Sequence, residues 1–347
     1  MTRERFERIE VRTGERSGCT VAVAVHSTAL GPALGGARMW HYAVPDDAVT
    51  DAKRLAAAMT LKAAAAGLDL GGGKGVLAAP AGAPPAGELR RALLLDFGDL
   101  VEELGGAYVT AEDVGTGSAD MDVIAERTSH VVGLDATRGG SGDPSPVTAL
   151  GVVAAMRACA EERFGSRDLA GVHVCVIGLG HVGTRVAEML TAAGARLTVT
   201  DIDPHRRTPM ERLGARWISP EEAVPARCDV LAPCALGGVI GMPEARELHC
   251  SVVCGAANNI LVEPAAADVL HERGITYAPD FIANAGGLIS VYGELRHLDH
   301  ARALELAAGI EGTMTSVLRA ARREGITPLD AARRLAKARL EPVAAAR

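Results

Sequence analysis

The segment GVHVCVIGLGHVGTRVAEMLTAAGARLTVTD, residues 171–201, constrains the fold of this chain more than any other part of the sequence. An apolar run typical of a strand leads into G-x-G-x-x-G at Gly178, Gly180 and Gly183, and a helical pattern and a second apolar run follow up to Asp201. Such glycines allow a tight turn, close approach of a pyrophosphate to a helix N-terminus, and close packing of the helix on the strand. With the acidic residue in place, the dinucleotide-binding fingerprint is complete. The segment predicts a Rossmann-type parallel sheet that binds a dinucleotide.

The acidic residue also predicts which dinucleotide binds. Asp201 would accept hydrogen bonds from the adenosine ribose and repel a 2′-phosphate, so NAD is favoured over NADP, although Arg206 and Arg207 lie nearby in the sequence. His181 and Val182 lie inside the fingerprint and are predicted cofactor contacts, with His181 expected at the helix N-terminus.

Strands and loops continue to alternate after the fingerprint. The segments CDVLAPCAL, ELHCSVVCGAANNIL and GITYAPDFIANAGG each place a strand before a polar or glycine-containing loop. Ligands bind at the carboxyl ends of strands in such sheets, so these loops are expected to face the cofactor. Cys234 and Ala235, which follow the first of these strands, are therefore predicted cofactor contacts.

The residues before the fingerprint also alternate between strand and helix patterns. GCTVAVAVHS predicts a strand, and DDAVTDAKRLAAAMTLKAAAAG predicts a helix that begins at Asp46 or Asp47 and is stopped by Gly67. The glycines at 71–73 are expected to form a turn before a short strand, GVLAAP. ELRRALLLDFGDLVEEL predicts a helix, and AYVTAEDV a strand with acidic residues at its end. The fold class is therefore α/β.

A stretch rich in glycine and proline, TRGGSGDPSP, marks the domain boundary. Ser145 is predicted to cap the next helix, with Pro146 as its first residue. We expect a substrate-binding and oligomerisation domain over residues 1–137, a NAD-binding domain over 138–325, and a helical tail over 326–347 that packs on the first domain.

Composition narrows the class of partner. The 347 residues are 48% hydrophobic and 23% charged, which is typical of a folded protein. A net charge of −7 without a basic run argues against nucleic acid, and the charged N-terminus and lack of a long apolar run predict a cytoplasmic protein without a membrane partner. The seven cysteines include no C-x-x-C pair, so reduced thiols and no metal site are predicted.

Lys74 follows three glycines, as the lysine of a phosphate-binding loop would. The required Ser or Thr after it is Gly75, however, and the first glycine position is occupied by Leu68, so the phosphate interpretation fails. The first domain instead offers two lysines and a carboxylate that can converge on one substrate, Lys62, Lys74 and Asp113. An amino acid would suit them, because it needs a cation for its carboxylate and a proton acceptor for its amine. Clustered lysines lower each other's pKa, which lets one of them act as a base near neutrality.

Six motifs, in order, resemble the Glu/Leu/Phe/Val dehydrogenase family. They are MTLKAAAAGLDLGGGKGV, TAEDVGT, GSGDPSPVTALGV, GLGHVG, GAANN and APDFIANAGG. The resemblance implies a two-domain NAD-dependent enzyme that reversibly deaminates an L-amino acid to the 2-oxo acid, ammonium and NADH. It also implies a homo-oligomer, either a dimer or an octamer, and an interdomain cleft that closes during turnover.

The resemblance assigns roles to residues in the first domain. Lys62 corresponds to the lysine that binds the substrate carboxylate, Lys74 to the general base that activates water, and Asp113 to the aspartate that exchanges protons with the substrate amino group. The carboxylate site is lined by Gly35, Gly36 and Met59. The glycines before Lys74 are expected to bring the backbone close to the substrate.

The resemblance also assigns residues in the second domain. Asn258 and Asn259 correspond to residues that reach the cofactor ribose and the substrate. Thr148 and Asn284 correspond to residues that hold the nicotinamide carboxamide.

The substrate side-chain pocket is predicted to be apolar. Its residues are Leu34, Ala111, Leu288 and Val291. Family members that act on glutamate carry a lysine near the first position and a serine after NAGG, and burying a carboxylate without a cation costs on the order of several kcal/mol, so glutamate is rejected. Leu288 stands where members acting on leucine often have valine, which favours a shorter side chain. We expect valine, leucine or isoleucine, with phenylalanine as the alternative.

Two other functions fit the fingerprint alone. A hydroxy-acid dehydrogenase would usually need a His–carboxylate pair, and none stands out in the sequence. An NAD-binding sensor without catalysis has no need of Lys62, Lys74 and Asp113 together. Considered alone, Lys62 could also be a solvated residue at a helix C-terminus, where a cation is favoured. Asp113 could likewise be a loop residue that caps a turn.

Overall fold

The computed structural model describes residues 5–82 and 84–344, and it divides the chain into two compact units. Of these described residues, the first unit comprises those up to Gly142, residues 291–298 and those from Ala336 onward, and the second comprises 143–290 and 299–335. The division falls after Gly142, whereas the sequence pattern placed it after residue 137, and the C-terminal residues that belong to the first unit start at Ala336 rather than at 326.

The first unit is built on a five-stranded mixed sheet with the order β1-β2-β4-β3-β5. Its strands are β1 (Arg8–Thr13), β2 (Thr20–Ser27), β3 (Ala33–His41), β4 (Gly71–Ala79) and β5 (Tyr108–Glu112). The helices in its N-terminal segment are α1 (Pro45–Ala65), α2 (Gly87–Glu103), α3 (Ser118–Ile124) and the 3-10 helix η1 (Ala136–Arg138). β3 pairs in parallel with β4 and β5, while β2 is antiparallel to β1 and β4.

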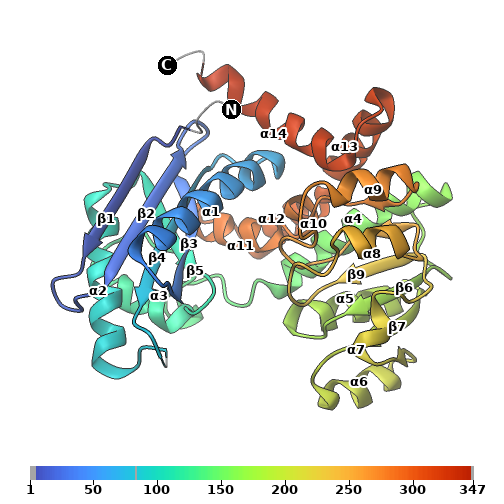
Figure 1. Ribbon diagram of the computed structural model, residues 1–347, viewed down its shortest axis with the longest axis horizontal. Helices are drawn as coiled ribbons and strands as arrows, with labels where there is room; N and C mark the ends of the chain where they lie inside the picture. The colour runs from blue at the N-terminus through green and yellow to red at the C-terminus, as the bar shows by residue number, and fades with distance from the viewer. Residues whose placement is uncertain (1–4, 83, 345–347) are drawn as a thin grey trace. The chain divides into compact units, whose positions relative to one another are not determined.

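The two faces of this sheet are packed differently (Figure 1). On one face, large apolar side chains of the strands pack with Phe97 of α2 and Met121 of α3. On the other face, α1 presents Ala48, Ala52 and Ala56, which recur every four residues and form one stripe of the helix. These small side chains let α1 lie close to the central strand β4.

The glycine segment before Lys74 is a strand, so the predicted turn is wrong. A side chain on these glycines would collide with the protein: a Cβ would lie 2.1 Å from Thr60 N at Gly72, 2.6 Å from the Tyr108 ring at Gly73, and 2.3 Å from the Phe97 ring at Gly75. The glycines make room for α1 and for two aromatic rings. Packing against protein atoms thus requires these glycines, and the expected approach of their backbone to a substrate stays a prediction.

Two helix starts also differ from the sequence interpretation. α1 begins at Pro45 with Val44 as N-cap, and Asp46 and Asp47 lie in the first turn, where carboxylates favour the helix dipole. Gly67, with φ of 74°, follows the end of α1 as expected. In the second unit, α4 begins at Ser145 itself.

The start of α4 is satisfied by a different side chain from the one predicted. The backbone N–H of Ser145 donates to Asp143 Oδ1 at 2.9 Å, so Asp143 satisfies the first helical amide. Ser145 is therefore the first helical residue, and the expected serine cap is wrong.

The second unit is a doubly wound parallel sheet with the order β11-β10-β9-β6-β7-β8, as the fingerprint predicted. Its strands are β6 (His173–Ile177), β7 (Arg196–Thr200), β8 (Arg216–Trp217), β9 (Val230–Pro233), β10 (Val252–Val253) and β11 (Thr276–Tyr277). The helices from α4 onward are α4 (Ser145–Phe164), α5 (His181–Ala192), η2 (Pro204–Arg206), α6 (Arg207–Arg212), α7 (Pro220–Ala223), α8 (Met242–Glu247), α9 (Ala266–Glu272), α10 (Asp280–Ala283), α11 (Gly286–Leu295), α12 (His300–Ala308), α13 (Ile310–Glu324) and α14 (Pro328–Ala344). In the part of the chain that the structure describes, we find no helix with the length and apolar character needed to cross a membrane.

Arg339 of α14 is bound to the connection between α1 and β4. Its Nη1 donates to the backbone oxygen of Leu68 at 2.6 Å and to that of Ala64 at 3.4 Å, and its Nη2 pairs with Asp69 Oδ1 at 2.7 Å. A cation here satisfies carbonyls at the C-terminal end of α1. The C-terminal helix thereby stabilises the link that leads into the strand of Lys74.

Arg339→Ala should destabilise the first unit because these carbonyls lose their donor. We expect the free energy of unfolding to fall by about 1–2 kcal/mol, measured by urea unfolding followed by circular dichroism. The control is Arg334→Ala, which removes an exposed pair with Glu324 and should change stability by less than about 0.5 kcal/mol. An equal loss in both variants would contradict the role given to Arg339.

Candidate active site

The charged residues singled out in the first unit lie on or beside the face of the sheet that α1 covers. Lys74 stands two positions before Val76, whose side chain packs with the alanines of α1, so both side chains point to that face. Asp113 directly follows β5, and Lys62 lies in the last turn of α1. The fold therefore places these predicted site residues on neighbouring elements.

Lys74 and Asp113 are brought into direct contact. Lys74 Nζ lies 3.0 Å from Asp113 Oδ2, and the Lys74 side chain is 5% exposed. Arg38 of β3, which the sequence analysis missed, donates from Nε to the same oxygen at 2.8 Å. The sequence did contain one indication that Arg38 belongs to the site. Arg38 lies two positions after Gly36, and residues two positions apart in a strand face the same side of the sheet.

The electrostatics of this cluster suit proton transfer. Burial lowers the pKa of the Lys74 ammonium, although Asp113 acts in the opposite direction and Arg38 reinforces the lowering. Burial would raise the pKa of the Asp113 carboxyl, but Lys74 and Arg38 together hold this pKa below its ordinary value. The cluster thus keeps a charged carboxylate next to a lysine that loses its proton more easily than usual.

Arg38 is itself held by Asp51 of α1, and two further residues hold Asp51. Its Nη1 donates to Asp51 Oδ2 at 3.1 Å. The Tyr42 hydroxyl donates to the same oxygen at 2.8 Å, and Arg54 donates to Asp51 Oδ1 at 2.7 Å. Burial and the hydrogen bond to Asp51 raise the pKa of Tyr42, so this phenol stays protonated as a donor.

The residues predicted to surround the substrate carboxylate lie on α1 and β3. Met59 precedes Lys62 by three positions, so both lie on one side of α1. A Cβ on Gly36 would lie 2.7 Å from the Asp113 Cβ, and one on Gly35 would lie 1.8 Å from the Gly73 backbone oxygen. Packing alone thus requires both glycines, and their contact with a carboxylate stays a prediction.

The predicted apolar pocket residues are mostly buried. Leu34 of β3 and Ala111 of β5 belong to paired strands, and their alternation places them on the same face as Lys74. Leu288 is buried and Val291 half-buried, and their spacing of three places both on one side of α11.

In the second unit, the three fingerprint glycines have three different surroundings. Gly178 has φ of 95°, and a Cβ there would lie 2.4 Å from the Ala235 Cβ. A Cβ on Gly183 would lie 2.0 Å from the Gly178 backbone oxygen and 3.2 Å from the Cys234 Cβ, whereas one on Gly180 would meet no described atom within 4 Å. The first glycine makes the turn, the third packs helix on strand, and the second leaves space for a ligand.

The residues after the second glycine start the helix, as predicted. α5 begins at His181 and continues through Val182, and Gly180 is its N-cap. Both residues therefore lie where the helix N-terminus meets the open space at Gly180.

Asp201 stabilises the fingerprint loop. Its Oδ2 accepts from the Leu179 backbone N–H at 2.6 Å, and its Oδ1 accepts from the Asp203 N–H at 2.8 Å. Arg206 pairs with Asp203 at 3.5 Å, while Arg207 pairs with Glu211 at 2.8 Å. Each arginine thus has an acidic partner of its own.

Asn284 carries a buried oxygen that the described protein does not satisfy. Its Nδ2 donates to Asn258 Oδ1 at 2.8 Å and also reaches the backbone oxygens of Ala256 and Ala257. Its Oδ1 is buried without a hydrogen-bond partner among the described residues. Such an atom costs about 1–3 kcal/mol, which a ligand donor would offset.

Two further predicted residues lie close to this asparagine or to α11. Asn259 has a left-handed backbone with φ of 52°, a conformation enriched in asparagine and in functional loops. The Thr148 hydroxyl donates to the Pro144 backbone oxygen at 3.0 Å and keeps its acceptor capacity, and a Cβ on Gly287 would lie 3.5 Å from it. Thr148, Asn258, Asn259 and Asn284 thus offer a set of amide and hydroxyl groups typical of a polar ligand site.

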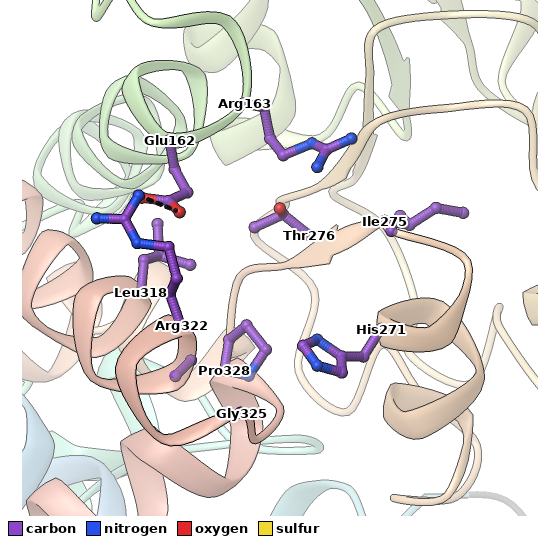
Figure 2. A pocket seen from close by; sticks show the side chains of 11 residues that line it. Glu162, Arg163, His271, Ile275, Thr276, Leu318, Arg322, Gly325 and Pro328 are labelled. Carbon is purple, nitrogen blue, oxygen red and sulfur yellow. Dashed lines mark hydrogen bonds and ion pairs between the residues drawn. The ribbon is translucent and has the colours of Figure 1, made fainter.

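A separate cavity of about 300 Å³ lies in the second unit. Its lining includes Thr276, the first residue of β11, and Glu162 and Arg322, which form an ion pair at 3.1 Å (Figure 2). It therefore lies at the amino end of a strand, whereas the fingerprint follows the carboxyl end of β6. The described residues that line it include none of the predicted site residues.

Substitutions at the second and third fingerprint glycines should separate binding from folding. Gly180 has φ of −66°, which any residue adopts, so Gly180→Ala should fold normally and weaken dinucleotide binding by about tenfold or more by occupying the open space. Gly183→Ala should lower the stability of the second unit by about 1–3 kcal/mol because its Cβ meets a backbone oxygen. Thermal unfolding and NADH fluorescence titration measure the two effects, and destabilisation by both variants would refute the assignment at Gly180.

Comparison with known proteins adds an independent finding. A family model described as Glu/Leu/Phe/Val dehydrogenase, dimerisation domain, matches residues 4–130, and one described as Glutamate/Leucine/Phenylalanine/Valine dehydrogenase matches residues 201–342. Residues 152–236 match the NAD binding domain of D-isomer specific 2-hydroxyacid dehydrogenases, which agrees with the fingerprint.

Relatives match nearly the whole chain. The leucine dehydrogenase of Bacillus subtilis (strain 168) is 43% identical, over 97% of this chain and 92% of its own length. The valine dehydrogenase of Streptomyces virginiae is 41% identical, over 96% of this chain and 93% of its own. The crystal structure of L-tryptophan dehydrogenase from Nostoc punctiforme matches with a TM-score of 0.86 and 35% identity, and the match covers 97% of this chain and 96% of that one. The chain therefore belongs to the Glu/Leu/Phe/Val dehydrogenase family, which confirms the resemblance identified in its sequence.

Proposed function

We propose that the protein catalyses the reversible NAD-dependent oxidative deamination of an L-amino acid with a branched aliphatic side chain, giving the 2-oxo acid, ammonium and NADH. The observation that carries the proposal is the buried contact between Lys74 and Asp113, in a chain about as similar to leucine dehydrogenases as to valine dehydrogenases.

The chain's own residues move the protons. The charged Asp113 carboxylate accepts a proton from the substrate ammonium group, which makes the amine neutral before the hydride leaves the α-carbon. Neutral Lys74 then takes a proton from the water that attacks the imine carbon. Asp113 returns its proton to the nitrogen, which leaves as ammonia. The hydroxyl proton passes to the departing ammonia as the carbonyl forms, which gives ammonium, and Lys74 then releases the proton that it took from water to the solvent.

Lys62 supplies the positive charge for the substrate carboxylate, with Gly35, Gly36 and Met59 around it. A lysine at the C-terminal turn of α1 suits this task because the helix dipole favours a cation there. The side chain of the substrate is held by Leu34, Ala111, Leu288 and Val291, whose apolar surfaces offer no partner for a second carboxylate.

NAD, when bound, accepts the hydride from the substrate α-carbon. The residues fit such a group: Gly180 leaves room for the pyrophosphate beside His181 and Val182, and Asn284 Oδ1 is ready to accept from the nicotinamide carboxamide together with Thr148. Cys234 and Ala235 follow β9 and pack on the fingerprint glycines, so they border the same space.

The remaining polar residues of the second unit select and place the cofactor. Asn258 and Asn259 are assigned to the cofactor ribose and the substrate. NAD is favoured over NADP because Asp201 would repel a 2′-phosphate, while Arg206 and Arg207 are each engaged by an acidic residue.

The protein is further proposed to act as a homo-oligomer, a dimer or an octamer. Support comes from the match of residues 4–130 to a family model described as a dimerisation domain.

The proposed substrate class can be tested with the purified chain. We expect NADH to form at alkaline pH with L-valine, L-leucine or L-isoleucine in preference to L-phenylalanine and L-glutamate, and NADP to support much less turnover than NAD. Absorbance at the NADH band measures the rate. Preference for phenylalanine would replace the proposed pocket, and no turnover in a protein that still binds NADH would favour a sensor.

Lys74→Ala should lower kcat by about 10²–10⁴-fold, because the neutral lysine is the proton acceptor for the attacking water. NADH binding, followed by fluorescence, should be unchanged since Lys74 belongs to the other unit. Lys337→Ala, which removes an exposed lysine of α14, is the control and should keep full activity. Retained turnover in Lys74→Ala, or a loss of NADH binding, would contradict the role given to this lysine.

A further inference from the structure

The two oxygens of the Asp113 carboxylate have different surroundings. Oδ2 receives both Lys74 Nζ, at 3.0 Å, and Arg38 Nε, at 2.8 Å. Oδ1 accepts no hydrogen bond from the residues that the structure describes, and the side chain is 23% exposed. One oxygen is thus fixed from two sides, and the other is open to a ligand.

Arg38 is well suited to fix the first oxygen. A guanidinium is planar, permanently charged, and carries N–H groups that point in fixed directions. Arg38 uses Nε for Asp113 and Nη1 for Asp51, at 2.8 and 3.1 Å. Tyr42 and Arg54 hold Asp51 in turn, so the guanidinium cannot rotate without breaking contacts to α1.

We propose that Arg38 is a positioning residue for the proton transfers: it holds Asp113 Oδ2 against Lys74, so that Oδ1 is directed to the substrate amino group. This inference rests on the proposed function. In the absence of Arg38, the carboxylate would be free to turn both oxygens toward Lys74, which would strengthen that ion pair and withdraw the oxygen that serves the substrate.

Arg38 also acts on Lys74 through its charge. The charged groups that act on the Lys74 ammonium are Asp113 after β5, Arg38 on β3 and Asp51 on α1. Burial lowers the pKa of Lys74, the two carboxylates raise it, and Arg38 lowers it. Loss of Arg38 therefore raises this pKa, both by removing a positive charge and by leaving Asp113 to Lys74 alone.

The other elements packed on β4 carry further titratable groups. His26 of β2 bonds Thr60 of α1 through Nδ1 at 2.8 Å, and Lys62 lies in the last turn of α1. Tyr108 of β5 belongs to the opposite face of the sheet, and burial raises the pKa of its phenol so that it stays neutral. Substitution of Arg38 leaves these three groups in place.

The sign of the expected effect follows from the role of Lys74. Because neutral Lys74 is the base, log(kcat/KM) rises as the pH passes the pKa of Lys74. In Arg38→Ala this acid limb should move to higher pH by roughly one unit or more. kcat at neutral pH should fall, and the affinity for NADH should stay within about twofold.

Two further variants separate positioning from stability. Arg38→Lys keeps the charge but not the fork, so it should shift the acid limb less than Arg38→Ala while kcat stays low. Arg90→Ala removes a comparable pair in the same unit, between Arg90 and Asp120 at 2.6 Å, and should lower Tm without moving the acid limb. If Arg38→Ala does not fold, Arg38→Lys decides the matter through its kcat.

A second readout does not depend on turnover. Cyanate reacts with a neutral amine, so the pH dependence of Lys74 carbamylation, followed by peptide mass spectrometry, reports its pKa directly. A shift of this profile to higher pH in Arg38→Ala, with no dehydrogenase activity in the parent protein, would reject the proposed function and retain the effect of Arg38 on Lys74. Unshifted pH profiles in both assays, with activity loss that only follows Tm as in Arg90→Ala, would overturn the inference.

Discussion

The structure of the first unit depends on burying a lysine. Removing an ammonium group from water costs on the order of several kcal/mol unless a partner of opposite charge is held close to it. Here three parallel neighbours, β4, β3 and β5, supply Lys74, Arg38 and, just past the last strand, Asp113. The charge of the lysine is therefore compensated within the sheet, and α1 closes over it without leaving an isolated ion.

The glycines of β3 and β4 make this arrangement possible. Strand centres are usually filled with branched side chains, yet at Gly72 the space is taken by the backbone of α1, and at Gly36 by the side chain of Asp113. Glycines at these positions thus let neighbouring protein atoms come closer than a side chain would allow. A charged cluster can then lie on a sheet face that is otherwise covered by the alanines of a helix.

The sequence predicted those features of the fold and the site that are determined by residues close together in the chain. The fingerprint fold was predicted because its glycines, helix and acidic residue are contiguous in the chain. The strand at Gly71–Ala79 was mistaken for a turn because its glycines are explained by Thr60, Tyr108 and Phe97, which are distant in sequence. The roles of Lys62, Lys74 and Asp113 came from the family resemblance, whereas Arg38 was missed since its partners become visible only once β3, β4 and β5 are paired. The unsatisfied oxygen of Asn284 likewise has no signature in the sequence.

The double use of Asp201 has a consequence for cofactor engineering. The same carboxylate that is assigned to the ribose also accepts the Leu179 amide of the fingerprint loop. A redesign toward a phosphorylated dinucleotide that simply removes the acid would leave this amide without its acceptor and loosen the turn that the phosphates require. Selectivity and loop geometry are therefore linked in this chain, and a successful redesign must supply a replacement acceptor for Leu179 along with the new positive charge.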